Sequence, residues 1–335
     1  MRASTVTRRA LAIALCAFTI YTLMDTFVIR RSYSSQSEAV TELFPQSGEK
    51  SEDTAESAYV LELSSSTGDP GDTAAVSGAR EEGADSTLCL PDGAAVIGSY
   101  SEEGCDITLY TFRTEGTQVY LADVYASSAQ YLKTALADGV YGRNVTEKTS
   151  VIAQDVGAVL AVNGDYYGSR QSGYVIRNGV LYRDAADGDS EILVVYANGS
   201  FEIVSGAEYT AQQLLENGAW QVFSFGPGLV AGGEISVSAS SEVGRAMASN
   251  PRTAIGVAGE GHYVLLVSDG RTADSEGLGL YQLGCLMQKL GCSEAYNLDG
   301  GGSSTMVFLG QVVNAPTTNG KRISERSVSD IVYIG

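Results

Sequence analysis

The sequence predicts a mixed α+β domain, built mainly from antiparallel sheets with a few packed helices. Two observations lead to this fold class. Asn178-Gly179 and Asn198-Gly199 each lie between two apolar runs, which is the strongest short-range signal for a β-hairpin. Elsewhere, short segments that alternate apolar and polar residues recur along the chain, as half-buried strands do. Because helical patterns are fewer than strand patterns, we expect antiparallel pairing to dominate.

The strands follow the alternating segments in chain order. The first hairpin joins Tyr174–Ile176 to Val180–Tyr182, and the second joins Ile192–Tyr196 to Phe201–Val204. The other predicted strands are Ile107–Phe112, Gln118–Tyr125, Val159–Asn163, Gln221–Phe225, Thr253–Val257, Tyr263–Ser268 and Ile331–Ile334.

Three segments have helical character. Thr149–Val156 and Thr210–Asn217 are short and begin with threonine, a residue that caps helix N-termini. Gly277–Leu290 is longer and is followed by Gly291, the residue type that most often ends a helix. One face of this longest helix is apolar, so we expect it to pack on a sheet.

The chain has four predicted regions. Residues 1–9 form a cytoplasmic tail and 10–29 an apolar membrane anchor, flanked by arginines that favour a cytoplasmic N-terminus. A cleaved signal peptide is the alternative, although no convincing cleavage site follows the apolar run. Residues 30–87 form a disordered acidic spacer and 88–335 a single globular domain. The domain is therefore expected outside the cytoplasm, joined to the cell membrane by one span.

The formal net charge of −19 comes mostly from the spacer and its surroundings. Between residues 32 and 104, fifteen acids face only Lys50 and Arg80. Such a composition cannot bury enough apolar area to offset the entropy of ordering, so the spacer should hold the domain away from the membrane. The chain has no basic stripe, which argues against a nucleic-acid partner.

Five cysteines give no zinc-binding spacing, and His262 is the only histidine. Cys89 with Cys105 is a candidate disulfide at the entrance to the domain, since bonds of this kind form outside the cytoplasm. Cys285 and Cys292 are interpreted as small buried residues. A Ser-His-Asp hydrolase is improbable with one histidine placed before an apolar strand.

The segment Asn297–Met306 is the most informative in the chain. It places Asp299 before the consecutive glycines Gly300, Gly301 and Gly302, and Ser303 after them. Three glycines between two strands cost backbone entropy and pack nothing, so they indicate a close approach of the backbone to a ligand. A tight hairpin turn is the structural alternative. The segment is neither a P-loop nor a nucleophile elbow.

Other polar loops share one position, directly after a predicted strand. Asn163-Gly164-Asp165 follows one strand and Asp269-Gly270-Arg271 follows another. Arg252 precedes a strand, and Glu325-Arg326 precedes the last one. Several carboxylates, several guanidinium groups and a glycine loop together suit a substrate that is both a sugar and an anion. Each of these residues alone is more often a turn former or a surface ion pair.

These motifs, in this order, resemble the phosphodiester glycosidase family over residues 105–335. The resemblance rests on Asn163–Tyr167, Pro251–Gly256, Asp269–Arg271, Asn297–Ser304 and Glu325-Arg326. It implies hydrolysis of the bond between a sugar anomeric carbon and a phosphodiester. Bacterial members are described as exopolysaccharide-related, which points to a sugar-phosphate polymer or glycoconjugate of the cell envelope as substrate, with α-linked N-acetylglucosamine as one candidate sugar.

On this hypothesis, Asp299 and Asp269 are the principal catalytic carboxylates and Glu325 is a third carboxylate or orients Arg326. The expected substrate-binding residues are Asn163, Asp165, Arg252, Arg271, Gly300, Gly301, Gly302, Ser303 and Arg326. No cofactor is predicted. Two alternatives remain: a non-catalytic domain that binds cell-wall polysaccharide, and a calcium-stabilised structural domain, which the arginines fit poorly.

Overall fold

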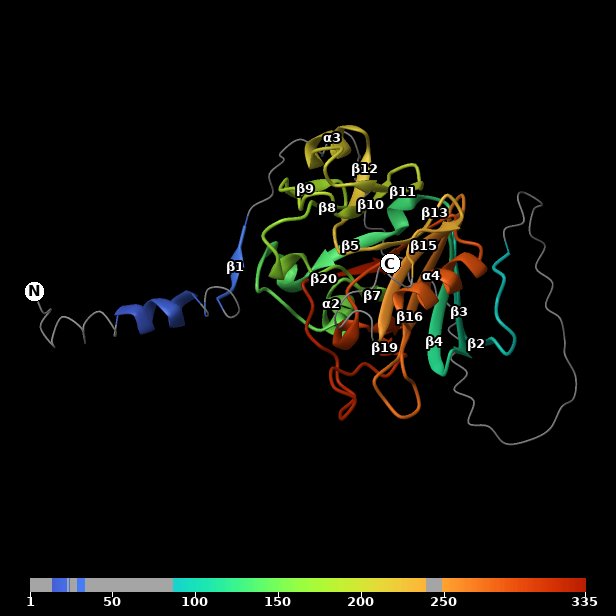
Figure 1. The fold of residues 1–335 in the computed structure, drawn as a ribbon. Helices are drawn as coiled ribbons and strands as arrows, with labels where there is room; N and C mark the ends of the chain where they lie inside the picture. Colours follow the sequence, from blue (N-terminus) through green and yellow to red (C-terminus); the bar gives the residue numbers. More distant parts are fainter. Residues whose placement is uncertain (1–13, 23, 25–28, 34–86, 239–248) are drawn as a thin grey trace, which may run out of the picture.

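The computed structural model describes residues 14–22, 24, 29–33, 87–238 and 249–335 (Figure 1). Residues 14–22 and 24 are helical. No helix among these described residues has both the length and the apolar character needed to cross a membrane. Much of the predicted anchor, and the spacer between residues 34 and 86, lie outside the described residues, so both remain predictions.

The largest sheet in the described chain has eight strands, in the order β14-β13-β17-β15-β16-β4-β3-β2, and every neighbouring pair is antiparallel. Long hairpins build most of it, because β3 follows β2, β4 follows β3 and β16 follows β15. Its strands are β2 (Ala95–Glu102), β3 (Cys105–Thr114), β4 (Thr117–Ala126), β13 (Gly228–Ala231), β14 (Glu234–Ile235), β15 (Arg252–Gly259), β16 (His262–Ser268) and β17 (Glu294–Asn297).

Two five-stranded antiparallel sheets complete the domain. One has the order β19-β18-β7-β20-β5 and the other β11-β10-β12-β8-β9. The first contains β5 (Lys133–Leu136), β7 (Leu160–Asn163), β18 (Met306–Phe308), β19 (Gln311–Val312) and β20 (Asp330–Ile334). The second contains β8 (Val175–Arg177), β9 (Val180–Arg183), β10 (Glu191–Tyr196), β11 (Phe201–Ser205) and β12 (Ala219–Phe223). A further pair joins β1 (Arg31–Ser32) to β6 (Gly142–Arg143).

The alternation along β15 and β16 explains how the layers stack. Ile255 and Leu265 face a core shared with the two smaller sheets, while Ala254 and Leu266 face a second cluster. The second cluster is closed by α4 (Leu280–Lys289), which buries Leu283, Leu286 and Met287. Both faces of these central strands are therefore covered, and Figure 1 shows α4 beside β13.

Two short helices close the smaller sheets. α2 (Thr149–Asp155) packs against β7 and β20, and α3 (Ala211–Glu216) packs against β9 and β12. Thr210 caps α3 in a capping box with Gln213, as its sequence predicts. The predicted threonine cap of α2 is wrong: Lys148 occupies the N-cap, and Thr149 is buried in the first turn.

The predicted fold class is confirmed in its main features, since antiparallel sheets dominate and few helices pack on them. Both hairpins form around their Asn-Gly dipeptides, with positive φ at Asn178, Gly179 and Gly199. The predicted long helix begins at Leu280, three residues later than its sequence pattern suggests. Gly291 follows it with φ of 99°, a conformation that favours glycine.

The predicted disulfide between Cys89 and Cys105 is wrong, because both cysteines are free. Cys105 is buried at the first residue of β3, whereas Cys89 lines a surface hollow with Thr114, the last residue of the same strand. Ten residues of extended strand span roughly 30 Å, far more than a disulfide can bridge.

Candidate functional site

The loops after β7, β16 and β17 meet at one end of the domain. The backbone of Asp299 donates a hydrogen bond to the Gly164 carbonyl at 3.2 Å, which joins two of these loops. In the large sheet, Ser268 lies opposite Arg252, and the Leu298 backbone bonds to Thr253 at 2.9 Å. Hence β16 and β17 both end beside the start of β15, and their loops emerge at the same edge.

Asn163 holds this junction together from inside. It is fully buried, and its side-chain amide donates to the Asp299 carbonyl at 2.6 Å. Its side-chain oxygen accepts from the Thr253 hydroxyl at 2.7 Å and from the Thr305 backbone at 3.3 Å. With its amide used in this way, Asn163 positions the loops, and the structure offers no exposed surface by which it would bind a sugar.

Asp299 and Arg326 form the polar pair at the surface of the site. The guanidinium Nη2 lies 2.8 Å from the Asp299 carboxylate, and Nε donates to the Ser303 hydroxyl at 2.8 Å. The Arg326 side chain is 40% exposed and the Asp299 side chain 11%. Burial raises the pKa of Asp299 above its ordinary value, while Arg326 and Ser303 oppose that rise. The pair is therefore open to a ligand on its arginine side.

The glycine loop fits tightly among arginines. A Cβ on Gly301, whose φ is 64°, would stand 2.9 Å from the Arg271 guanidinium, and one on Gly300 would stand 2.9 Å from the Pro251 carbonyl. Arg271 is held by the Asn250 side chain, and the charge of Arg326 adds to burial in lowering the pKa of Arg271. Two predicted arginines thus stand close enough to interact, beside a loop that tolerates little side-chain volume.

Arg252 lies deeper than these two arginines. Its side chain is buried, and its Nε donates to the Leu278 carbonyl at 2.9 Å. Gly300 lies next to it, since a Cβ there would be 3.9 Å from its Cδ. Arg252 therefore supports the glycine loop from behind and adds positive charge under it.

Asp269 has a different set of partners. Its carboxylate accepts from the Ala315 backbone at 2.8 Å and from the Asn314 side chain at 3.1 Å, and it also bonds Tyr120. Burial raises the pKa of Asp269, and these three donors oppose the rise. The same contact, with burial, raises the pKa of Tyr120 to about 12. Asp269 consequently fixes the segment that follows β19, and its partners are different from those of Asp299.

The structure places Glu325 away from Asp299, although Arg326 is the next residue. The two oxygens of Glu325 bond the backbone N–H and the hydroxyl of Ser150, at 3.0 and 2.7 Å. Ser150 lies in the first turn of α2, where a carboxylate satisfies an unpaired N–H and complements the helix dipole. Glu325 therefore caps a helix, in contrast to the catalytic or orienting role predicted for it.

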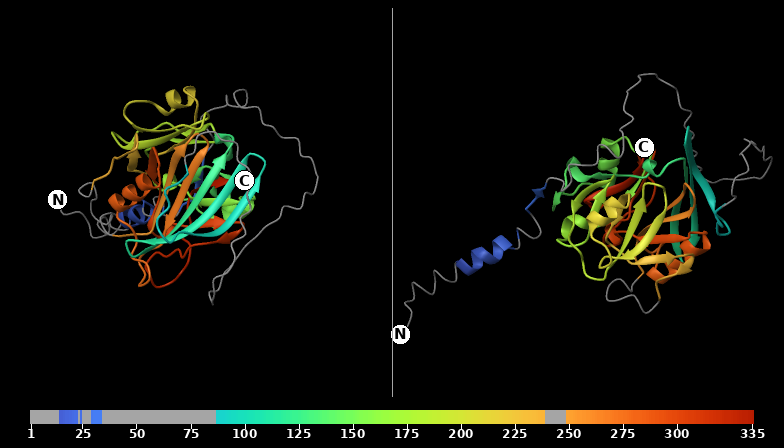
Figure 2. Two further views of the ribbon diagram at one scale, coloured as in Figure 1. Left: turned by 90° about the vertical axis from the view of Figure 1, so that its right-hand side faces the viewer. Right: turned by 90° about the horizontal axis from the view of Figure 1, so that it is seen from above.

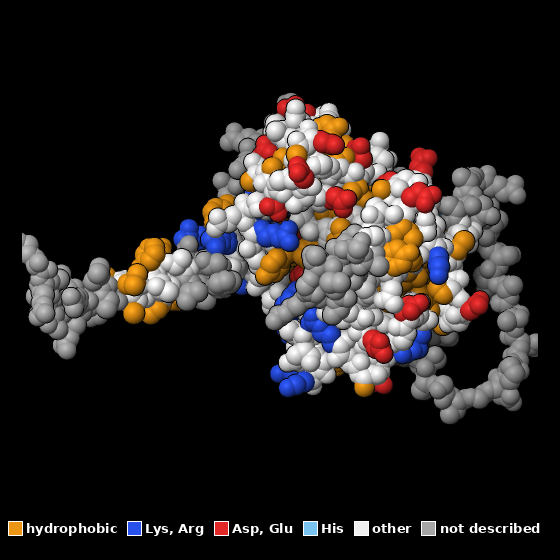
Figure 3. Space-filling view, viewed as in Figure 1, with side chains coloured by type: hydrophobic (Ala, Val, Ile, Leu, Met, Phe, Trp, Pro, Cys, Tyr) orange, Lys and Arg blue, Asp and Glu red, His pale blue; other side chains and the backbone are white. Residues whose placement is uncertain are grey.

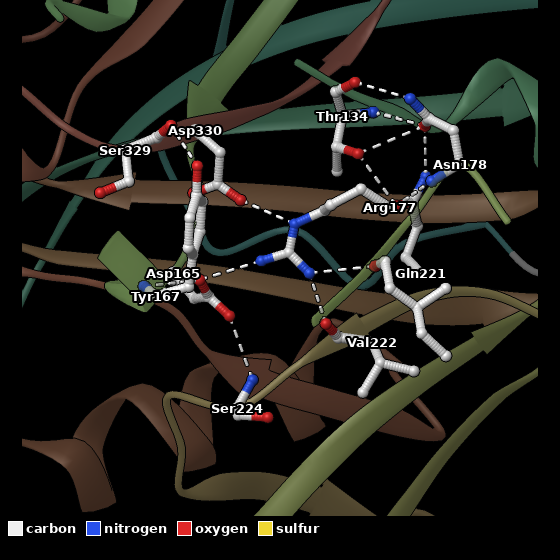
Figure 4. Close-up of polar contacts among 12 residues, drawn as sticks. Thr134, Asp165, Tyr167, Arg177, Asn178, Gln221, Val222, Ser224, Ser329 and Asp330 are labelled. Carbon is white, nitrogen blue, oxygen red and sulfur yellow. Dashed lines mark hydrogen bonds and ion pairs between the residues drawn. The ribbon is translucent and has the colours of Figure 1, made fainter. Parts of the chain in front are cut away.

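Asp165 lies in a buried ion cluster, apart from the Asp299–Arg326 pair (Figure 4). Arg177 reaches Asp165 at 2.9 Å and Asp330 at 2.8 Å, with all three side chains at most 2% exposed. Asp165 also accepts from the backbones of Tyr167 and Ser224. Its position is incompatible with direct contact to a substrate at the surface, which corrects the binding role predicted for it.

The second carboxylate of the cluster is poorly satisfied. One oxygen of Asp330 bonds Arg177, while the other is buried with no hydrogen-bond partner. That carboxylate lies against Gly164, where an added Cβ would overlap it. Burial, together with the nearby charges of Asp165 and Asp299, raises the pKa of Asp330 to about 7, against the pull of Arg177.

Sequence reasoning missed Arg177 and Asp330. Arg177 reads as the end of an apolar strand before Asn178-Gly179, and Asp330 as a turn residue before an apolar strand. The one available signal was a charged residue at each strand boundary, which is common in exposed turns. Among the described residues, no three His, Cys, Asp or Glu side chains are grouped so as to hold a metal ion.

Comparisons with known proteins add to this geometry. The chain is 31% identical over 181 residues to an uncharacterised SPbeta prophage-derived protein of Bacillus subtilis, a match that covers 52% of this chain and only 28% of that protein. The zebrafish N-acetylglucosamine-1-phosphodiester α-N-acetylglucosaminidase catalytic domain, solved in a form auto-inhibited by its pro-peptide, is similar in fold, with a TM-score of 0.56 and 21% identity. That likeness covers 72% of this chain and 87% of the zebrafish domain.

A hypothetical protein from Synechocystis shares the fold at a TM-score of 0.51 and 15% identity, over 72% of this chain and 64% of the other. The decisive match is to a family: residues 156–335 match the phosphodiester glycosidase family, and this stretch contains the loops after β7, β16 and β17 as well as Arg326. On this match over more than half of its length, the chain belongs to the phosphodiester glycosidase family.

Proposed function

We propose that the protein is a glycosidase that hydrolyses the bond between a sugar anomeric carbon and a phosphodiester. The observation that carries the proposal is the Asp299–Arg326 pair beside the glycine loop, because it combines a carboxylate with a guanidinium at the surface of the site. Family membership supports the same reaction class. The proposed substrate is a polymer or glycoconjugate of the cell envelope, with α-N-acetylglucosamine as the first sugar to test.

In the proposed reaction, a water molecule adds to the anomeric carbon as the bond from that carbon to the phosphate oxygen breaks. The bonding electron pair leaves with the phosphate, and Asp299 takes a proton from the water. A phosphate group is a stable anion that needs no proton in order to leave. One carboxylate can therefore suffice, which agrees with the separate structural partners of Asp269 and Glu325.

The arginines and the loop have the complementary role. In the proposal, Arg326 and Arg271 hold the phosphate oxygens, and their charge stabilises the negative charge that develops there as the bond breaks. The position of Arg326 beside Asp299 and of Arg271 beside the glycine loop supports this role. The glycines at 300–302 let this loop pack against Pro251, Arg271 and Thr318, which holds it beside the arginines. Arg252 lies beneath the loop, next to Gly300, and adds positive charge there.

The test is release of free sugar from a panel of sugar-1-phosphodiesters by the purified full chain. Asp299→Asn should lower the rate about 10²- to 10⁴-fold, the usual effect of losing a group that transfers a proton. Asp187→Asn, which changes an exposed aspartate, is the matched control and should keep the rate. Full activity of Asp299→Asn would refute the assigned role, and wild-type binding without sugar release would favour a purely binding domain.

A further inference from the structure

The short segment before the predicted spacer is built into the edge of the domain. β1 pairs antiparallel with β6, with Arg31 opposite Arg143 and Ser32 opposite Gly142. The pairing extends at both ends: the Tyr33 backbone donates to the Tyr141 carbonyl at 2.6 Å, and the Asn144 side chain donates to the Ile29 carbonyl at 3.1 Å. Five consecutive residues, 29–33, are thus attached to residues 138–146 of the domain.

Side chains strengthen this attachment. Arg30 bonds the Asp138 carboxylate at 2.6 Å and the Thr146 carbonyl at 2.9 Å. The Tyr33 ring lies 5.9 Å from that of Tyr141, which in turn stacks on Tyr167. In Figure 3, Lys and Arg side chains gather where the N-terminal segment meets the domain.

The domain also has a shape that fits the segment. A Cβ on Gly142 would overlap the Arg31 carbonyl and approach Val145, so only glycine lets β1 lie this close. The φ of Gly142 is not in the left-handed region, so the need for glycine here comes from crowding, in which the Arg31 carbonyl lies nearest and the domain's own Val145 second. A close approach of another backbone is the usual reason for such a glycine in a strand.

We propose that residues 29–33 are a permanent edge strand of the globular domain. Residues 34–86, which are most of the predicted 30–87 spacer, then connect this strand to residue 87 of the same domain. The spacer does not separate the domain from the apolar N-terminal segment, contrary to the expectation from composition. Figure 2 shows β1 between the N-terminal helical residues and the domain. If the predicted anchor is in a membrane, the domain is held directly at the membrane surface.

The edge that holds β1 is also connected to the candidate site. Glu147, next to the segment that holds β1, forms an antiparallel bridge with Val328. Val328 is two residues after Arg326, so the edge that binds β1 continues into the segment that carries the arginine proposed above to bind phosphate. The attachment is therefore a short, direct link between the N-terminal segment and the site.

Cross-linking of the full chain tests the proposal. Arg31→Cys with Arg143→Cys places two thiols on directly opposed residues of the antiparallel pair, at a spacing that suits a disulfide. Serine replaces the exposed Cys16 and Cys89, and a protease site is inserted between Thr67 and Gly68. After mild oxidation and cleavage, a non-reducing gel reports whether the two fragments remain joined.

We expect most of the Arg31→Cys/Arg143→Cys protein to remain joined within one chain. The control pair Ser37→Cys/Arg143→Cys, which lies six residues out of register, should largely separate. Adding Tyr33→Pro removes the N–H that binds Tyr141 and should reduce the joined fraction, whereas Tyr59→Pro in the spacer should not. Equal cross-linking of both pairs would refute the proposal, and so would covalent dimers as the main product, which would place the strand on a second copy.

Discussion

The molecule uses the same pair of residue types, arginine and aspartate, in two regions with opposite consequences. In the cluster of Arg177, Asp165 and Asp330, all three side chains are at most 2% exposed and the arginine is shared between two carboxylates. At the candidate site, Arg326 is 40% exposed and meets one carboxylate, that of Asp299. Burial turns the first group into a structural element, whereas exposure leaves the second able to exchange its partner for a substrate.

The two regions are nevertheless connected. Gly164 lies against the Asp330 carboxylate on one side and accepts a hydrogen bond from the Asp299 backbone on the other. A single backbone turn after β7 therefore separates the buried cluster from the site. The buried cluster therefore holds the turn against which the site is built. The substitutions below test the cluster and the site separately.

The largest expected effect comes from Arg177→Met, which leaves two buried carboxylates without their shared cation. Removing one partner from a buried ion pair costs about 3–5 kcal/mol of unfolding free energy. Urea unfolding of the purified protein measures this loss. Arg170→Met is the matched control, because Arg170 lies near the surface with Asp187 at 3.9 Å and the Ser224 carbonyl at 3.1 Å, and its loss should cost about 1–2 kcal/mol. Equal losses in the two variants would contradict the structural role of the cluster.

Arg326→Gln probes the exposed side of the comparison. It removes the cation that opposes the rise in the pKa of Asp299, so that pKa should move further up. Since the proposed mechanism needs ionised Asp299, the acid limb of the kcat/KM profile should shift to higher pH. The loss of a phosphate contact should also lower kcat/KM by about 10- to 100-fold, in keeping with one charge-assisted hydrogen bond. An acid limb that does not move would separate Asp299 from the pH dependence.

Asp330→Asn tests the buried carboxylate whose pKa is raised to about 7. An acid with a higher pKa in the folded state than in the unfolded chain holds its proton more tightly when folded. The stability that this proton contributes is complete below about pH 4 and is lost as pH rises through about 7. The unfolding free energy of the wild type minus that of Asp330→Asn should therefore decrease as the pH rises across this range. A constant difference from pH 4 to pH 8 would contradict the raised pKa.

The sequence predicted the antiparallel fold because its strongest signals are local. Asn178-Gly179 defines its own hairpin, and the capping box of Thr210 and Gln213 defines a helix start. The sequence also indicates the loops that meet at the site, because each follows a strand. It does not indicate which partners their side chains have. Asp165 and Asp299 look alike in the sequence, and only long-range packing against Arg177 or Arg326 distinguishes the two.

Glu325→Gln gives the smallest expected effect and tests that distinction directly. Its carboxylate bonds Ser150 in the first turn of α2, so the loss of its charge should lower the unfolding free energy by about 0.5–2 kcal/mol, as for other helix caps. Sugar release should stay close to wild type, because Glu325 is turned away from Asp299. Urea unfolding and the sugar-release assay on the same preparation separate the two effects. A large loss of activity with unchanged stability would return Glu325 to the catalytic role that its position beside Arg326 first suggests.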